Sequence, residues 1–331
     1  MLANDGQNPS HPTHVNRPGN VQKFPPVTTA TIALCIFIYT GLAIQNDYNS
    51  LDTLARFGYL TAPFVYKGGY WSLITSAFVH FNFLHFAFNA FWLWTFGRYC
   101  ELLMGSVRYG LFVVAAAFVS SAMQFAVSGG ISIGASGVGY ALFGFLWVTR
   151  KYSPSIKQVL TNKIVSNFIT WLFLCIGLSA FDILNIANTA HFSGLAFGML
   201  LGAVGIRYQT NIARAGAAVA LAISAISLVW NPWSVEWLLH RAYQAHEAEA
   251  YKLALTYYNR VLEKDGNYAW AFRNRAYVHD SLGYSELARA DWEQAVQLDP
   301  TLRSEWEEWL EWLEWLNNQQ SDSASTSSEL N

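Results

Sequence analysis

Charge is what this 331-residue sequence lacks most. Lys, Arg, Asp and Glu make up 13% of it and hydrophobic residues 53%, whereas an ordinary soluble domain carries about 25% charged residues. The deficit is uneven, because residues 1–230 hold only 5 Asp and Glu beside 12 Lys and Arg, and residues 231–331 hold 17 and 8. The split indicates a mildly basic membrane part followed by an acidic soluble part, and the net charge of −2 gives no reason to expect a nucleic-acid partner.

Cysteine is also rare, with three residues that form no Cys-x-x-Cys pair and lie in or beside apolar runs: Cys35, Cys100 and Cys175. They are expected to be small buried hydrophobes, so no disulfide framework, metal site or cofactor is predicted. A cleavable signal peptide is excluded as well, because the polar, Asn-, His- and Pro-rich residues 1–26 follow no apolar run. They are predicted to form a disordered cytoplasmic arm.

Six apolar segments follow and predict an all-α membrane bundle with a core at residues 27–208. Several are shorter than the ~20 residues of a spanning helix, as expected where a helix begins inside the protein. Residues 215–230 form a probable seventh span within a connecting region, 209–234. The six are Val27–Ile44, Leu73–Phe96, Tyr109–Val127, Gly137–Val148, Phe168–Phe181 and His191–Ile206.

Loop charges orient these segments. Lys and Arg gather between segments 2 and 3, between segments 4 and 5, and after segment 6, whereas the loops on the opposite side carry few. By the positive-inside rule the N-terminus is cytoplasmic. The starts of segments 4 and 6, at Ser136 and His191, then lie toward the outer face of a membrane, expected to be the plasma or inner membrane. A seventh span would place the C-terminal part outside the cytoplasm.

The C-terminal part repeats with a period of 34 residues. Arg241-Ala242-Tyr243 recurs as Arg275-Ala276-Tyr277, and Leu253-Ala254 as Leu287-Ala288. This pattern resembles the tetratricopeptide repeat, so residues 235–316 are expected to form a small helical module that binds a protein partner. An amphipathic helix at 302–316 is predicted to cap its apolar face, and the Ser-rich residues 317–331 are expected to be a disordered tail.

The apolar sequence is interrupted by Gly134-Ala135-Ser136-Gly137, which permits two interpretations. Ser136 is either the N-cap of a helix or a nucleophile with free backbone N–H groups beside it. Polar residues at membrane depth are functional candidates by default, and segment 2 supplies three: His80, His85 and Asn89. His85 and Asn89 share one helical face and are predicted to be donors to an oxyanion.

Small residues predict how His191 would reach Ser136. Gly194, Gly198 and Gly202 lie four residues apart in segment 6, and segment 4 has a similar face, so the two helices can pack backbone to backbone. That contact would bring His191 within hydrogen-bond reach of Ser136. No Asp or Glu is placed to complete a triad, which leaves a Ser–His dyad. Tyr140, one turn after Ser136, is expected to pack there, where its ring can support the imidazole.

These motifs together resemble the rhomboid intramembrane serine proteases. The resemblance rests on Gly134-Ala135-Ser136-Gly137 with Tyr140, on His80, His85 and Asn89, and on Ala190-His191-x-x-Gly194-x-x-x-Gly198. It implies a six-helix core that cleaves transmembrane proteins near their outer ends. By the same resemblance, Ser136 is the nucleophile and His191 the general base and acid. His85, Asn89 and the Ser136 backbone N–H then form the oxyanion hole, with His80 and Gly134 in support.

The leading hypothesis is therefore an intramembrane serine endopeptidase in a lipid bilayer, with transmembrane proteins as its substrates. The alternative is a non-catalytic relative that binds transmembrane segments for quality control. A small-solute transporter is disfavoured, because the core helices carry too few acidic residues for intramembrane charge pairs.

Overall fold

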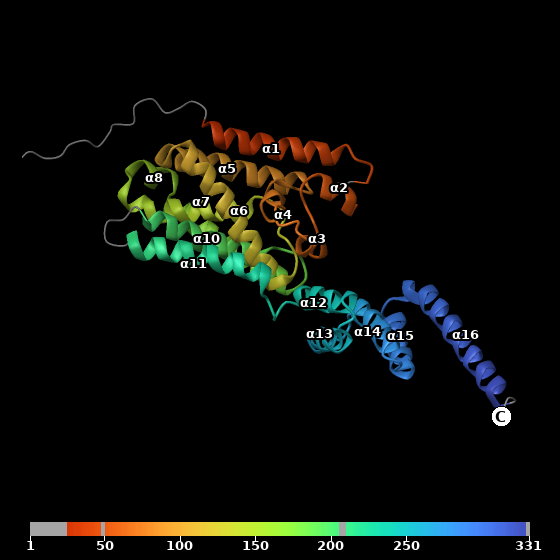
Figure 1. Ribbon diagram of the computed structural model, residues 1–331. Coiled ribbons are helices and arrows are strands. Elements are labelled where there is room, and N and C mark those ends of the chain that lie inside the picture. Colours follow the sequence, from red (N-terminus) through yellow and green to blue (C-terminus); the bar gives the residue numbers. More distant parts are fainter. Residues whose placement is uncertain (1–24, 48–49, 205–209, 329–331) are drawn as a thin grey trace, which may run out of the picture.

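The computed structural model describes residues 25–47, 50–204 and 210–328, so the predicted arm lies almost wholly outside the described part. The described chain is all-α, with a bundle of long helices followed by a separate group of soluble helices (Figure 1). The bundle helices are α1 (Pro26–Ala43), α5 (Phe83–Met104), α6 (Ser106–Ser128), α7 (Ser136–Thr149), α9 (Asn162–Ala180), α10 (Asn188–Val204) and α11 (Thr210–Val229). Short helices connect them: α2 (Leu51–Arg56), α3 (Ala62–Tyr66), α4 (Ser72–Thr75) and α8 (Pro154–Val159).

The outside of the bundle is suited to lipid. Among the described residues, four stretches are long and apolar enough to cross a membrane: Pro26–Ala43, Ser106–Ser128, Asn162–Ala180 and Asn211–Val229. Large apolar side chains face outward, with Phe37 71% and Leu84 79% exposed, a surface that a soluble protein would not leave uncovered. Helices α7 and α10 are shorter, at 14 and 17 residues, and lie largely buried among the others. The bundle is thus a polytopic membrane fold.

The second predicted segment, Leu73–Phe96, is not one helix, and that prediction was wrong. The chain forms α4 and a single 3-10 turn at Ser76–Phe78, and α5 begins only at Phe83. Asn82 has extended backbone, and its side chain accepts a hydrogen bond from the His85 N–H at 2.8 Å. An Asn N-cap satisfies one of the free N–H groups of a helix start. It therefore fixes the beginning of α5 within a run that apolar composition alone cannot divide.

Glu101 ties three helices together at the opposite end of the bundle. Its carboxylate, 2% exposed, accepts hydrogen bonds from the Val27 N–H at 3.0 Å, the Thr28 N–H at 2.9 Å and the Thr28 hydroxyl at 2.8 Å. It also accepts from the Ser106 hydroxyl at 2.7 Å, in the first turn of α6. The charge lies at the positive ends of two helix dipoles, and it satisfies backbone donors that the start of α1 leaves free.

Replacement of Glu101 by alanine is expected to destabilise the bundle by about 3 kcal/mol, because it leaves buried N–H donors without an acceptor. Glu101→Gln keeps one acceptor oxygen and should cost roughly half as much. Equilibrium unfolding of the purified protein in mixed micelles measures both. The exposed Asp52→Ala serves as the control and should change stability by less than about 0.5 kcal/mol. Equal stability of Glu101→Ala and Asp52→Ala would contradict this account.

The C-terminal part consists of two helical hairpins and a long last helix. The hairpins are α12 (Val235–Glu247) with α13 (Tyr251–Lys264), and α14 (Ala269–Ser281) with α15 (Ser285–Leu298). Positions 34 residues apart have the same environment: Ala242 and Ala276, Ala254 and Ala288, and Tyr258 and Trp292 are all 0% exposed. Small residues thus let the paired helices approach while an aromatic ring fills each hairpin, so the sequence period is a period of packing.

Helix α16 (Arg303–Ser328) is longer than expected. It begins as predicted after the second hairpin and buries Trp309 and Leu313 against it. Its backbone stays helical to Ser328, whereas the sequence predicts a disordered tail from residue 317. Ser, Asn and Gln lower helix propensity by only a few tenths of a kcal/mol each, so polar composition alone does not end a helix.

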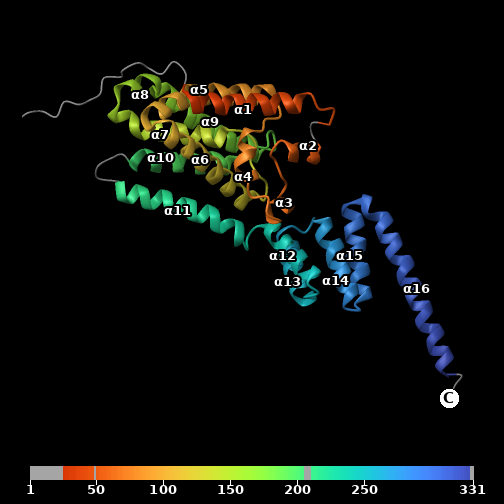
Figure 2. The same ribbon diagram turned by 45° about the horizontal axis from the view of Figure 1, so that its top comes forward.

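The first hairpin rests on the end of the bundle where α6 finishes and α7 begins. Tyr66 of α3 stacks on His240 of α12 with ring centroids 5.0 Å apart, and it also contacts Phe125 of α6 at 5.1 Å. The Asn231 side chain donates to the Ala126 carbonyl at 2.8 Å in a buried setting. Figure 2 shows α12 next to α3 at this end, with α16 farthest away. One apolar cluster therefore joins the loop before α4, the end of α6 and the hairpin.

Candidate active site

Helices α7 and α10 make the most extensive contact in the bundle, and glycines make it possible. A Cβ on Gly194 would collide with the Gly137 carbonyl, one on Gly198 with the Ala141 carbonyl, and one on Gly202 would press on Phe145. The side-chain-free stripe of α10 therefore lies directly on the backbone of α7. Such close approach is the usual role of small residues four apart in membrane helices.

This packing places His191 beside Ser136. Ser136 is the first residue of α7, His191 lies in the first turn of α10, and the His191 Nε2 and Ser136 Oγ atoms are 2.8 Å apart. His191 is 5% exposed. The Tyr140 ring lies against its imidazole, with centroids 4.8 Å apart and planes tilted by 35°. The imidazole is therefore held in position by both packing and a hydrogen bond.

A short loop brings the chain from α6 to Ser136. Gly134 has φ +96°, a conformation that favours glycine, and a Cβ there would also overlap the His85 ring. The Gly134 N–H donates to the Ser76 carbonyl at 3.1 Å. Ser121 and Ser132 are joined through their hydroxyls at 2.9 Å. The turn that carries Ser136 is thus fastened to the segment before α5 and to α6.

His85 and Asn89 lie one turn apart on α5 and face this loop. The position that a Cβ of Gly134 would occupy is 3.4 Å from Asn89 Nδ2. Asn89 is 5% exposed, and its Nδ2 has no hydrogen-bond partner among the described residues. A buried amide without an acceptor is costly. An acceptor that arrives at this place, beside Ser136, would satisfy it.

His80 belongs to the site but not to the helix that the sequence assigns it to. It lies in the irregular segment before α5, buried at 1% exposure. Its Nε2 accepts from the Ala135 N–H at 3.4 Å, and its Nδ1 is 3.2 Å from the Phe78 carbonyl, to which it donates in that tautomer. Its ring meets the edge of His85 at 5.0 Å. His80 therefore braces the Gly134–Ser136 turn from the side of α5.

Two residues that sequence reasoning missed position His191. Gln124 of α6 accepts a hydrogen bond from the Ala190 N–H at 3.1 Å through its side-chain oxygen. Asn188, the first residue of α10, donates to the Ser179 hydroxyl at 2.9 Å. Both fasten the start of α10 to neighbouring helices. The polar character of Gln124 inside an apolar segment was the available signal.

The arrangement has the chemistry of a nucleophile and its base. With its proton on Nδ1, His191 presents the Nε2 lone pair to the Ser136 hydroxyl. Nδ1 has no hydrogen-bond partner among the described residues, so no described carboxylate orients the imidazole. Ser136 begins a helix, so its own N–H has no acceptor within that helix. Donors and base thus surround one hydroxyl.

Comparison with known proteins agrees with this geometry. Residues 67–208 match the rhomboid domain. The rhomboid protease GlpG of Serratia proteamaculans (strain 568) is 32% identical over 188 residues, which is 56% of this chain and 65% of that protein. GlpG of Yersinia pestis (strain Pestoides F) and of Yersinia pseudotuberculosis serotype O:3 (strain YPIII) are each 33% identical over 178 residues, 53% of this chain and 61% of theirs.

These matches support the rhomboid family for the membrane part and, with the apolar helices, an integral multi-pass membrane protein. The chain spans less than two thirds of the length of these relatives. The rhomboid match ends at residue 208, before α11 and the helical hairpins.

Proposed function

We propose that this protein is an intramembrane serine endopeptidase that uses Ser136 and His191 as a catalytic dyad. The observation that carries the proposal is the 2.8 Å contact between His191 Nε2 and Ser136 Oγ, made between two glycine-packed helices beside an unsatisfied Asn89 amide. A nucleophile and base within hydrogen-bond reach are the signature of acyl-transfer catalysis.

In the proposed reaction, His191 Nε2 takes the Ser136 proton as Oγ attacks the carbonyl carbon of the scissile peptide bond. The tetrahedral intermediate collapses when the C–N bond breaks and the imidazolium returns the proton to the leaving amine. Water, deprotonated by the same imidazole, then hydrolyses the acyl–Ser136 ester and restores the hydroxyl. Tyr140 supports the imidazole through both steps.

The developing oxyanion is assigned three donors: the Ser136 backbone N–H, the Asn89 amide and the His85 ring. The N-terminus of α7 adds the positive end of a helix dipole. Each donor of this kind contributes about 3–4 kcal/mol to catalysis in other enzymes. Gly134 leaves room for the donors, and His80 positions the turn.

The substrates of this proposal are transmembrane proteins whose helices unwind enough for one peptide bond to reach Ser136. Loop charges put the N-terminus in the cytoplasm and the end of the bundle that bears Ser136 toward the outside. Helix α11 as a seventh span then puts the hairpins outside too, next to the active site. We assign the hairpins to the tetratricopeptide type and give them a protein-binding role.

The test is proteolysis by the purified protein in proteoliposomes. The substrate is a single-pass membrane protein whose helix contains Gly and Pro near its outer end, because those residues weaken helices. We expect two fragments, with the cut mapped by mass spectrometry to the outer end of the helix. An intact substrate, or a cut in its cytoplasmic part, would contradict the proposal.

A further inference from the structure

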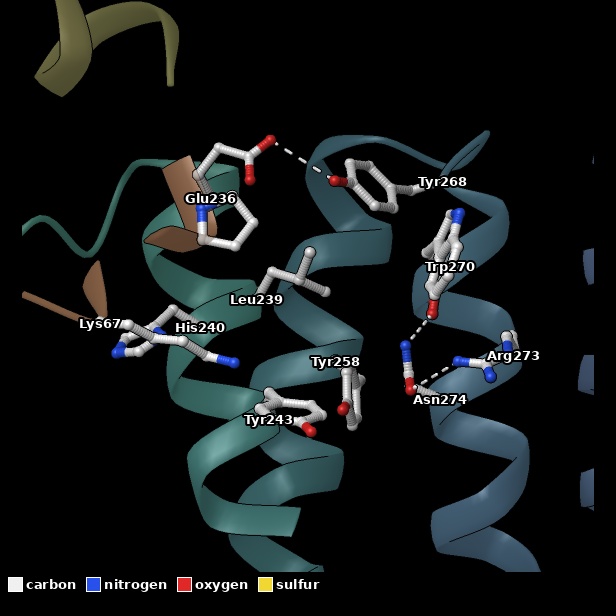
Figure 3. Close-up of a pocket in the computed structure, with 11 residues that line it drawn as sticks. Lys67, Glu236, Leu239, His240, Tyr243, Tyr258, Tyr268, Trp270, Arg273 and Asn274 are labelled. Atoms are coloured by element: carbon white, nitrogen blue, oxygen red, sulfur yellow. Dashed lines mark hydrogen bonds between the residues drawn. The ribbon is translucent and has the colours of Figure 1, made fainter. Parts of the chain in front are cut away.

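A cavity of about 520 Å³ lies where the first hairpin meets the bundle, within the usual size range of ligand sites. Helix α12 contributes Leu239 and Tyr243, α13 contributes Tyr258, and α14 contributes Trp270, while Lys67 reaches in from the loop after α3 (Figure 3). The walls are mainly aromatic and apolar. The site thus combines parts of the soluble helices with part of the membrane domain.

The polar groups of the cavity are mostly occupied, and one is not. Glu236 accepts from the Tyr268 hydroxyl at 3.4 Å, and Arg273 forms a bidentate ion pair with Glu305 of α16. Tyr258 is 0% exposed, and its hydroxyl has no hydrogen-bond partner among the described residues. A buried hydroxyl in a cavity wall costs free energy until a ligand supplies its partner. A peptide carbonyl is such a partner.

Lys67 adds a positive charge at the edge of the cavity. Its ammonium lies 5.7 Å from the centre of the Tyr243 ring. The ion pairs of the described residues do not include Lys67, so it has no carboxylate partner there. A ligand that offers both an apolar side chain and a carboxylate would therefore complement this site in shape and charge.

The cavity is near Ser136 along the chain. Glu236 in the cavity wall touches Gly129, because a Cβ on that glycine would overlap its side chain. Seven residues separate Gly129 from Ser136, and an extended chain of that length spans at most about 25 Å. A polypeptide in the active site could therefore enter the cavity with about seven or more further residues on the same side.

We propose that this cavity is an exosite that binds an extended segment of the substrate just outside the membrane, with an apolar side chain inside and an acidic residue at Lys67. The inference rests on the proposed protease function and extends it to substrate selection. The hairpins, held against α3 and α6, place a second contact on the same polypeptide that Ser136 cleaves.

The test uses two single-pass substrates with the same transmembrane helix. One carries an outer segment of about 12 residues with Phe and Asp, and the other carries Gly and Ser over the same length. In proteoliposomes with the full chain, we expect kcat/KM to be about tenfold higher for the Phe and Asp substrate, through KM. The exosite acts on binding before the chemical step, so kcat should be equal for both.

Variants locate the effect. Trp270→Ala and Lys67→Glu should each remove most of the preference by raising KM for the Phe and Asp substrate, with kcat and the Gly and Ser substrate unchanged. Trp270 is 52% exposed, so its loss leaves the fold intact. The matched controls Trp315→Ala and Lys252→Glu change exposed residues outside the cavity and should keep the full preference.

Equal kcat/KM of the wild type for the two substrates would overturn the exosite, as would a preference that survives both cavity variants. The exosite alone fails in those cases, because cleavage itself continues. Tyr258→Phe gives a further check and should weaken the preference without changing kcat. Failure of the wild type to cleave either substrate would instead overturn the protease function, and the exosite with it.

Discussion

Ser136→Ala is expected to abolish proteolysis, with a loss of about 10⁴–10⁶-fold in kcat, because no other group can form the acyl intermediate. The fold should persist, since the change removes one hydroxyl and one hydrogen bond, to His191. Fragment formation from the single-pass substrate measures the loss. Thermal unfolding in detergent verifies that the variant is folded, and its midpoint should stay within a few degrees of the wild type.

His191→Ala should lose activity to a similar extent, and the double variant should be no worse than either single one. Residues that act as one catalytic unit show this non-additivity. A structural role for the pair predicts the opposite pattern, in which stability falls and residual activity declines stepwise. Wild-type cleavage by Ser136→Ala would show that the assignment of the nucleophile is wrong.

Gly198→Leu has the second largest expected effect. A side chain at residue 198 must displace the Ala141 carbonyl, which belongs to helix backbone and cannot move alone. Helices α7 and α10 would separate, and Ser136 and His191 with them. Overpacking of this kind costs about 1–3 kcal/mol or more. We expect a clear loss of stability in micelles together with loss of nearly all proteolysis.

Gly177→Ala is the matched control for this change, because Gly177 lies within helix α9 and an added Cβ would meet no atom within 4 Å. Alanine has the higher helix propensity, so stability should be equal or slightly higher, with full activity. A Gly198→Leu protein as stable and active as Gly177→Ala would contradict the packing described between α7 and α10.

Much of the fold follows from the sequence because lipid imposes simple rules on it. Apolar runs give all-α spans, and the Gly194, Gly198 and Gly202 spacing gives the face on which α10 packs. Boundaries are harder. The start of α5 depends on the Asn82 N-cap, and the length of α16 depends on propensities too weak to read from composition.

The neighbourhood of Ser136 is only partly readable in the same way. The structure brings together Ser136, His191, Tyr140, His85 and Asn89, all of which motif and spacing select. The position of His80 outside the helix could not be predicted, because its contact with the Ala135 N–H joins segments 55 residues apart. Catalytic roles for these residues remain predictions.

The cavity between the bundle and the hairpins lies beyond sequence reasoning. The period of 34 residues predicts two helix pairs, but it says nothing about the surface on which they rest. Tyr66 and His240 are far apart in the chain, and their stacking depends on the shapes of two separate units. Long-range contacts of this kind are set by packing, which no local pattern encodes.

The central claim, that Ser136 is an activated nucleophile, is tested most directly by a fluorophosphonate probe on the protein in native membranes. Its phosphorus would bond to Ser136 Oγ as fluoride leaves and His191 takes the proton. We predict an adduct located on Ser136 by mass spectrometry, absent from His191→Ala and from denatured protein. An unmodified Ser136 in folded wild-type protein would contradict the account and favour a relative that binds transmembrane segments without cleaving them.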